Sequence, residues 1–259
     1  IDFYRRSLGF RLQSSEGDTA RLGAGEADLL VLTEKPGAAH VPGRSGLYHF
    51  AILLPSRPDL ALALKNLIET RTTLQGMSDH LVSEAVYLAD PDGNGIEIYR
   101  DRPREEWPRR DGNLEMTTQA LDLNDLLGEL SGLDRRQVEP ARGAELGHVH
   151  LRVNDIPAAE DFYVRVMGFD LMQRYGRQAS FVAAGGYHHH IGFNTWRSAG
   201  APQKPPGTTG LRYYGITLPS EEELQALLSR LEAAGHSFQA GEGGWSGYDP
   251  AGNGILLKA

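Results

Sequence analysis

The sequence contains no cysteine, and this absence excludes two kinds of site. Without thiol groups the chain can form neither a disulfide framework nor a thiolate metal centre. Any bound metal ion must therefore be held by histidine, aspartate or glutamate side chains.

Long apolar runs and an excess of positive charge are also absent. No apolar run approaches the about 18–20 residues that a membrane-spanning helix needs. The net charge is −8 at pH 7, which argues against general binding to nucleic acid or to an anionic membrane. The first ten residues, IDFYRRSLGF, lack the pattern of a signal peptide. We therefore expect a cytoplasmic protein with neither nucleic-acid nor membrane partners, and whether it forms a homo-oligomer stays open.

The remaining composition is typical of a globular protein. Hydrophobic residues make up 40% and charged residues 23% of the chain, which sets it apart from disordered sequences. At 259 residues it has room for one large or two ordinary domains with their own hydrophobic cores.

Short stretches of sequence recur and divide the chain into four modules. DFYRRSLGF near the start matches DFYVRVMGF further on, and ADPDGNGIEIY matches YDPAGNGILLK. GLYHFAILLPS likewise matches GLRYYGITLPS, and LGHVHLRVND has the same form. The repeats place the four modules at residues 1–45, 46–100, 146–200 and 208–259.

Each complete module predicts the order βαβββ, and hence an α+β fold. The first segment alternates apolar and polar residues, as a strand does, and a capped helix with apolar residues at helical spacing follows. Short strands separated by glycine turns complete the module. The sequence of module 1 is expected to start inside its helix, so we expect this module to lack its first strand in the sequence as given. Residues 101–145 match no module, and we expect a linker with a short amphipathic helix in the stretch LDLNDLLGEL.

The modules differ at two equivalent positions, where ionisable residues stand in modules 2 and 3. The first strands carry His49, His148 and Tyr213, and the last strands carry Glu97 and Leu256. Two imidazoles and one carboxylate suit non-haem Fe(II) or Mn(II). Taken singly, each histidine could instead be a buried residue bonded to the backbone, and Glu97 a solvated hairpin carboxylate.

At these motifs the chain resembles the vicinal oxygen chelate superfamily, which includes glyoxalase I, bleomycin-resistance proteins and extradiol dioxygenases. GLYHFAILLPSR, DHLVSEAVYLADPDGNGIEIYRDRP, GHVHLRVNDI and GGYHHHIGFN carry the resemblance, which is nearest to the bacillar catechol 2,3-dioxygenases. It implies that the modules form two open, cupped, β-barrel-like sheets with the helices outside. A shared site for His49, Glu97 and His148 requires module 2 to pair with module 3, and module 1 with module 4.

The resemblance also implies residue roles. His49, His148 and Glu97 match the iron ligands, and Tyr87 matches a tyrosine that binds a catecholate oxygen. His80 is the nearest match to a substrate-contacting histidine, although its spacing differs, and His189 matches the catalytic acid/base. The implied activity is Fe(II)-dependent extradiol cleavage of catechol or a substituted catechol with O₂, in the degradation of aromatic compounds, with Mn(II) as the other metal.

Two other functions remain open on the same scaffold. A glyoxalase-like isomerase or lyase would favour a fourth protein ligand, and module 3 offers no evident one. A bleomycin-resistance-type binding protein would lack the metal ligands, so His49, His148 and Glu97 argue against it.

Three further polar features lie near the predicted site. If His188, His189 and His190 lie in a strand, alternation prevents them from sharing one metal ion and puts His189 on the face of Ile191 and Phe193. Which of the three faces the site stays open. His150 and Arg152 share the face of His148. His150 either supports a ligand or lines the site, and for Arg152 an ion pair with a carboxylate is favoured over binding of an anionic substrate.

Overall fold

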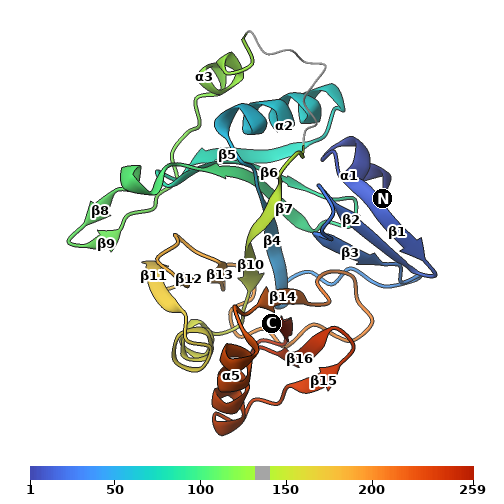
Figure 1. Ribbon diagram of the computed structural model, residues 1–259, viewed down its shortest axis with the longest axis vertical. Coiled ribbons are helices and arrows are strands. Elements are labelled where there is room, and N and C mark those ends of the chain that lie inside the picture. Colours follow the sequence, from blue (N-terminus) through green and yellow to red (C-terminus); the bar gives the residue numbers. More distant parts are fainter. Residues whose placement is uncertain (132–140) are drawn as a thin grey trace. The chain divides into compact units, whose positions relative to one another are not determined.

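The computed structural model describes residues 1–131 and 141–259, which form two compact units. Unit 1 comprises residues 1–38 and 49–147, and unit 2 comprises residues 39–48 and 148–259. The part of the predicted linker at 132–140 lies outside the described residues. Each unit is a mixture of strands and helices, as Figure 1 shows.

Unit 1 contains modules 1 and 2 except for residues 39–48, which include the start of the first strand of module 2 and belong to unit 2. Module 1 consists of α1 (Asp2–Arg6), β1 (Arg11–Glu16), β2 (Thr19–Gly23) and β3 (Leu30–Thr33), and module 2 of β4 (Gly46–Leu53), α2 (Arg57–Glu69), β5 (Leu74–Asp79), β6 (Ser83–Ala89) and β7 (Gly95–Asp101). In module 2 the strand order is β4-β7-β6-β5, and β4 runs parallel to β7. Ser56 caps α2 by accepting a hydrogen bond from the backbone N–H of Asp59, as serine does at many helix starts.

The linker follows module 2 and is partly structured. It contains η1 (Arg104–Glu106), β8 (Arg109–Arg110), β9 (Asn113–Leu114) and α3 (Leu123–Gly128). The expected short helix is therefore present as α3, and its residue Leu126 is fully buried. Packing of α3 against α2 accounts for this burial.

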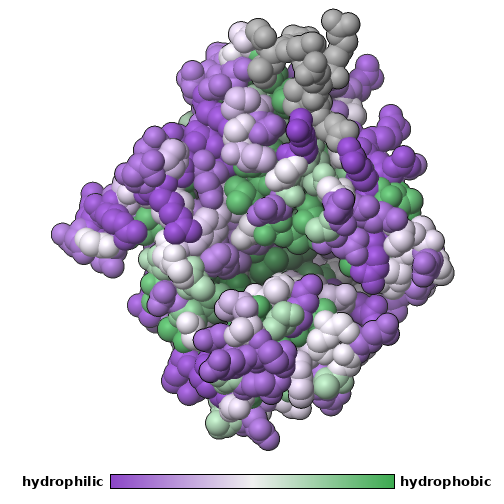
Figure 2. Space-filling view, viewed as in Figure 1, coloured by the Kyte–Doolittle hydropathy of each residue, from purple (hydrophilic) through white to green (hydrophobic). Residues whose placement is uncertain are grey.

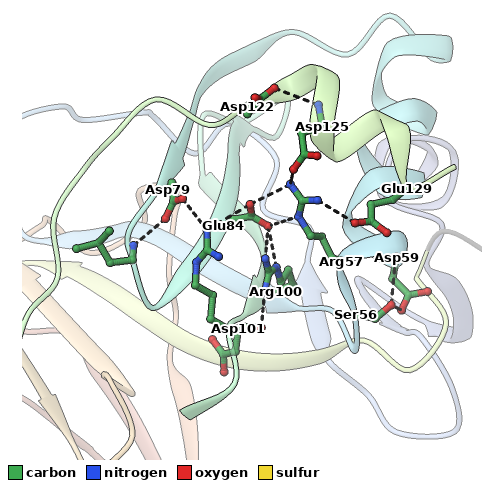
Figure 3. A network of polar contacts seen from close by, with 12 residues as sticks. Ser56, Arg57, Asp59, Asp79, Glu84, Arg100, Asp101, Asp122, Asp125 and Glu129 are labelled. Atoms are coloured by element: carbon green, nitrogen blue, oxygen red, sulfur yellow. Dashed lines mark hydrogen bonds and ion pairs between the residues drawn. The ribbon is translucent and has the colours of Figure 1, made fainter. Parts of the chain in front are cut away.

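A network of charged residues holds α3 to module 2 (Figure 3). Arg57 at the start of α2 donates to Glu84 of β6 and to Asp125 and Glu129 of α3, each through an atom pair 2.8 Å apart. Glu84 is 3% exposed and also accepts from Arg100 at 2.8 Å. A buried carboxylate is tolerated where arginines satisfy it in this way.

Unit 2 contains modules 3 and 4. Module 3 consists of β10 (Glu145–Arg152), α4 (Ile156–Glu160), the π-helical turn η2 (Asp161–Val166), β11 (Asp170–Tyr175), β12 (Ala179–Ala183) and β13 (Ile191–Asn194). Module 4 consists of β14 (Tyr214–Thr217), α5 (Glu221–Ala233), β15 (Gln239–Gly241), β16 (Gly244–Tyr248) and β17 (Gly254–Lys258). The strand orders are β11-β12-β13-β10 and β14-β17-β16-β15.

The complete modules share one strand register, which makes their positions equivalent. The first strand pairs in parallel with the last strand through Phe50 and Ile96 in module 2, Val149 and Ile191 in module 3, and Tyr214 and Ile255 in module 4. The predicted α+β fold of βαβββ modules with open sheets is thus confirmed. The pairing of module 2 with 3 and of module 1 with 4 stays a prediction.

The recurrent motifs meet inside each unit. In unit 1, Tyr4 of α1 donates a hydrogen bond of 2.7 Å to Asp90 in the DPDGNG turn. In unit 2, Tyr163 of η2 donates one of 2.9 Å to Asp249 in the DPAGNG turn. Both aspartates also accept hydrogen bonds from the asparagine of the same turn. The repeated tyrosine and aspartate therefore join two modules, and the aspartates also stabilise their own turns.

The core of unit 2 lies between its strands and helices. It includes Phe162, Ile191, Phe193, Leu227 and Ile255. The outer face of α5 is polar, and Figure 2 shows that hydrophilic residues cover most of the molecular face in view. No helix of the described residues has the length and apolar character needed to cross a membrane.

Candidate functional site

Unit 1 places His49 and Glu97 together on two adjacent strands. β4 and β7 pair in parallel with Ala51 opposite Glu97, and His49 lies two residues before Ala51 on the same face. Nε2 of His49 lies 3.0 Å from Oε2 of Glu97, and both residues are buried. Two ligand atoms about 2.1 Å from one metal ion and at right angles to each other lie about 3.0 Å apart. The pair therefore fits two positions of a metal centre.

Tyr87 and His80 extend this cluster within unit 1. Tyr87 lies opposite Glu97 in the antiparallel β6–β7 hairpin, which explains their separation of ten residues in the sequence. The rings of Tyr87 and His49 lie 5.7 Å apart. Nε2 of His80 lies 2.7 Å from the hydroxyl of Tyr87. Four of the predicted site residues thus meet in unit 1.

The linker determines which nitrogen of His80 carries the proton. Nδ1 of His80 lies 2.7 Å from the carbonyl oxygen of Thr117, which can only accept, so Nδ1 donates. In a neutral imidazole Nε2 then accepts the phenolic proton of Tyr87. A sequence reading misses this partner because Thr117 stands in the linker and acts through its backbone.

Gly147, the residue before His148, packs against the same face of unit 1. A Cβ at Gly147 would lie 1.8 Å from the hydroxyl oxygen of Tyr99. Tyr99 stands two residues after Glu97 in β7, so their side chains share a face. The backbone of Gly147 therefore lies against the end of the Tyr99 side chain.

In unit 2, His148 lies next to His189. The centroids of their rings are 4.1 Å apart, and His148 is buried. The ring of His189 also contacts Phe181 of β12 at 5.0 Å. The Nδ1 atoms of His188 and His189 lie 2.8 Å apart, so one of them donates to the other.

The expected strand conformation of the histidine triplet is wrong. β13 begins only at Ile191, and Gly185 and Gly186 in the preceding turn both have positive φ. Strand alternation therefore does not extend back to His189. Ile191 and Phe193 belong to the core, whereas His189 lies beside His148.

His150 continues the face of His148 along β10. Its Nε2 lies 2.9 Å from Nδ2 of Asn194 in β13. Gly192 lies opposite His150 in the parallel pairing, and a Cβ there would come within 3.1 Å of the His150 ring. By strand register Gly192 is the module 3 counterpart of Glu97, so that position carries no side chain.

Arg152 is the last residue of β10 and shares the face of His148 and His150. The prediction that it forms an ion pair with a carboxylate is wrong, because no such pair is found among the described residues. Its guanidinium carbon lies 5.4 Å from the centre of the Tyr48 ring. Tyr48 in turn contacts the ring of His150 at 5.0 Å and that of Trp196 at 5.2 Å. Burial lowers the pKa of Arg152; the Tyr48 hydroxyl opposes this shift, and the positive charge of Arg197 adds to it.

The fold and the two clusters define a class of protein: repeated βαβββ modules with histidines on equivalent first strands and a glutamate on a last strand. The family model of the "Glyoxalase/Bleomycin resistance protein/Dioxygenase superfamily" matches residues 1–98 and 145–257. The chain belongs to this superfamily, as its motifs predicted.

Individual relatives support the assignment. The chain is 47% identical over 255 residues to a protein of Bacillus subtilis (strain 168) named "Catechol-2,3-dioxygenase", covering 96% of this chain and 88% of that protein. A crystal structure of a Bacillus subtilis protein matches with a TM-score of 0.66 at 14% identity, over 99% of this chain and 79% of that one. Glyoxalase I from Zea mays matches with a TM-score of 0.59 at 15% identity, over 99% and 86%. The two structures show a shared fold.

Proposed function

We propose that the protein is an extradiol ring-cleaving dioxygenase that acts on catechol or a substituted catechol with O₂. The observation that carries the proposal is the buried His49–Glu97 pair with Tyr87 opposite the carboxylate. Similarity to a protein named catechol-2,3-dioxygenase supports the same reaction class. We also propose a cytoplasmic location, with an aromatic diol and O₂ as the small-molecule partners.

His148 is proposed as the third metal ligand beside His49 and Glu97. Each of the three is buried and offers an imidazole nitrogen or a carboxylate oxygen, which are donor types that such a metal ion takes. The first-strand position of His148 in module 3 is equivalent to that of His49 in module 2, which supports the same role for both histidines. Two imidazoles and one carboxylate suit Fe(II), which we propose, and also Mn(II).

The bound metal ion would supply Lewis acidity and open positions for the diol oxygens and O₂. The hydroxyl of Tyr87 would hold one diol oxygen, and the Thr117–His80 hydrogen bond would keep Nε2 of His80 ready to accept from that hydroxyl. His189, beside His148, would move the proton between the diol and the solvent side, since an imidazole titrates near neutral pH.

A glyoxalase-like isomerase is the second candidate, because maize glyoxalase I shares the fold. It would favour a fourth protein ligand at the module 3 counterpart of Glu97. That counterpart is Gly192, which has no side chain to offer. The lack of a ligand side chain at this position favours the dioxygenase over the isomerase.

The test is O₂ uptake after anaerobic loading of the protein with Fe(II). We expect one O₂ to be consumed for each catechol, with formation of a yellow semialdehyde product. The variants Glu97→Gln and His49→Ala should lose bound iron, measured by metal analysis, and more than about 100-fold of the activity, as loss of a ligand does at metal sites.

His40→Ala is the matched control, because His40 is an exposed histidine in unit 2. It should retain both the iron and the rate. If the protein converts a hemithioacetal and takes up no O₂ with any catechol, the dioxygenase proposal is wrong and the isomerase is the better assignment. Full iron content in Glu97→Gln would refute the ligand assignment.

A further inference from the structure

Unit 2 carries a continuous wall of ring contacts that connects His148 with Arg152. His148 contacts His189, His189 contacts Phe181, and Phe181 contacts His150 at ring-centroid distances of 4.1, 5.0 and 5.6 Å. The wall continues from His150 through Tyr48 to the guanidinium of Arg152. The proposed ligand and the arginine therefore belong to one surface.

The spacing along β10 suits a ligand that reaches both ends of this wall. His148, His150 and Arg152 alternate with core-facing residues such as Leu151, so the three share one face. Four strand residues span about 13 Å between Cα atoms. A substituted aromatic ring and the long arginine side chain together can cover this distance.

The charge of Arg152 has no carboxylate partner among the residues that the structure describes. The side chain is half-buried, and its guanidinium contact is the face of Tyr48. The neighbouring charge of Arg197 is also positive. A desolvated guanidinium without an anion is costly, and bidentate binding of a carboxylate satisfies it best.

We propose that the substrate is an aromatic diol that carries a carboxylate, and that Arg152 binds this carboxylate. The inference rests on the proposed function, since it places the diol at His148, the proposed metal ligand at one end of the wall. Trp196, 39% exposed and in contact with Tyr48 and His150, lines the side on which the ring would lie. The structure thus points to anionic catechols over catechol itself.

Anaerobic calorimetry on the Fe(II)-loaded protein tests this with 3,4-dihydroxyphenylacetate and the neutral 4-ethylcatechol. We expect the carboxylated diol to bind at least about ten-fold more tightly, as one charge-assisted bidentate contact provides. Arg152→Met should abolish this preference and leave the affinity for 4-ethylcatechol within about two-fold. Arg152→Lys should retain part of the preference.

Arg165→Met is the charge-matched control, because Arg165 forms an exposed ion pair with Asp161 on η2. It should keep the full preference. Equal affinities in the unaltered protein, or equal weakening of both ligands in Arg152→Met, would overturn the proposal.

Phenylacetate, which has no diol, separates failure of this proposal from failure of the proposed function. Binding of phenylacetate that is lost in Arg152→Met, without O₂ uptake on any diol, would uphold the arginine site and refute the dioxygenase. Cleavage of catechol without any preference for carboxylated diols would uphold the dioxygenase and refute the arginine site.

Discussion

At the scale of single residues, Gly147 is a position where an added methyl group would collide with a neighbouring side chain. The Tyr99 hydroxyl occupies the place of its Cβ, at 1.8 Å. We predict that Gly147→Ala lowers the free energy of unfolding by about 1–3 kcal/mol, because tyrosine or strand must move. Urea unfolding measures this change, and metal analysis should show weaker iron binding as His148 shifts.

Gly25→Ala is the control for this prediction. A Cβ at Gly25 meets nothing within 4 Å, so the change should stay within about 0.5 kcal/mol. Equal stability of Gly147→Ala and Gly25→Ala would contradict the close contact with Tyr99.

At the scale of elements, one arginine connects α2, β6 and α3. Arg57 donates to Glu84, Asp125 and Glu129, and its partner Glu84 is buried (Figure 3). We predict that Arg57→Met costs about 2–4 kcal/mol of unfolding free energy, since it removes one partner of a buried carboxylate. Hydrogen exchange should also increase in α3, because the arginine holds that helix to module 2.

Lys65→Met on the same helix is the comparison. Lys65 pairs with the exposed Glu69 one turn away, and such pairs contribute little. We expect a change below about 0.5 kcal/mol in urea unfolding. A similar loss for both variants would mean that the Arg57 network adds no more than a surface ion pair.

Among the elements, the starts of helices could be predicted from the sequence more accurately than the side chains that share a strand face. Ser56, Asp155 and Ser220 cap α2, α4 and α5 with their side chains, and such signals can be recognised in the sequence because a cap needs only its own turn. The strand expected at the histidine triplet does not form. The two left-handed glycines before it make a turn instead, and neighbouring strands decide where β13 begins.

At the scale of the whole molecule, buried tyrosines make the fold sensitive to alkali. Burial and the nearby Asp249 charge raise the pKa of Tyr163 and Tyr214, and burial and Asp90 raise that of Tyr4. Above a pH of about 10 the unfolded tyrosines lose their protons while the folded ones keep them. Stability should then fall by about 1.4 kcal/mol per pH unit for each such tyrosine.

Urea unfolding between pH 8.5 and pH 11 measures this slope. Tyr163→Phe should have a lower free energy of unfolding at pH 8.5. Its loss of stability with rising pH should be smaller by the contribution of one tyrosine. Tyr175→Phe, which alters a tyrosine that is 54% exposed, should leave the slope unchanged. Identical slopes in all three proteins would show that Tyr163 gains no protection from burial.

The sequence by itself determined the repeated βαβββ order, the superfamily and the candidate residues, because repeats, caps and turns are local patterns. It could also place Tyr87 opposite Glu97, since the length of a hairpin sets its register. Only the tertiary structure decided the tautomer of His80, the position of His189 and the surroundings of Arg152, which include no carboxylate partner among the described residues. Each depends on a partner distant in the sequence, whose place is set by packing: the Thr117 carbonyl, the His148 ring and the Tyr48 face.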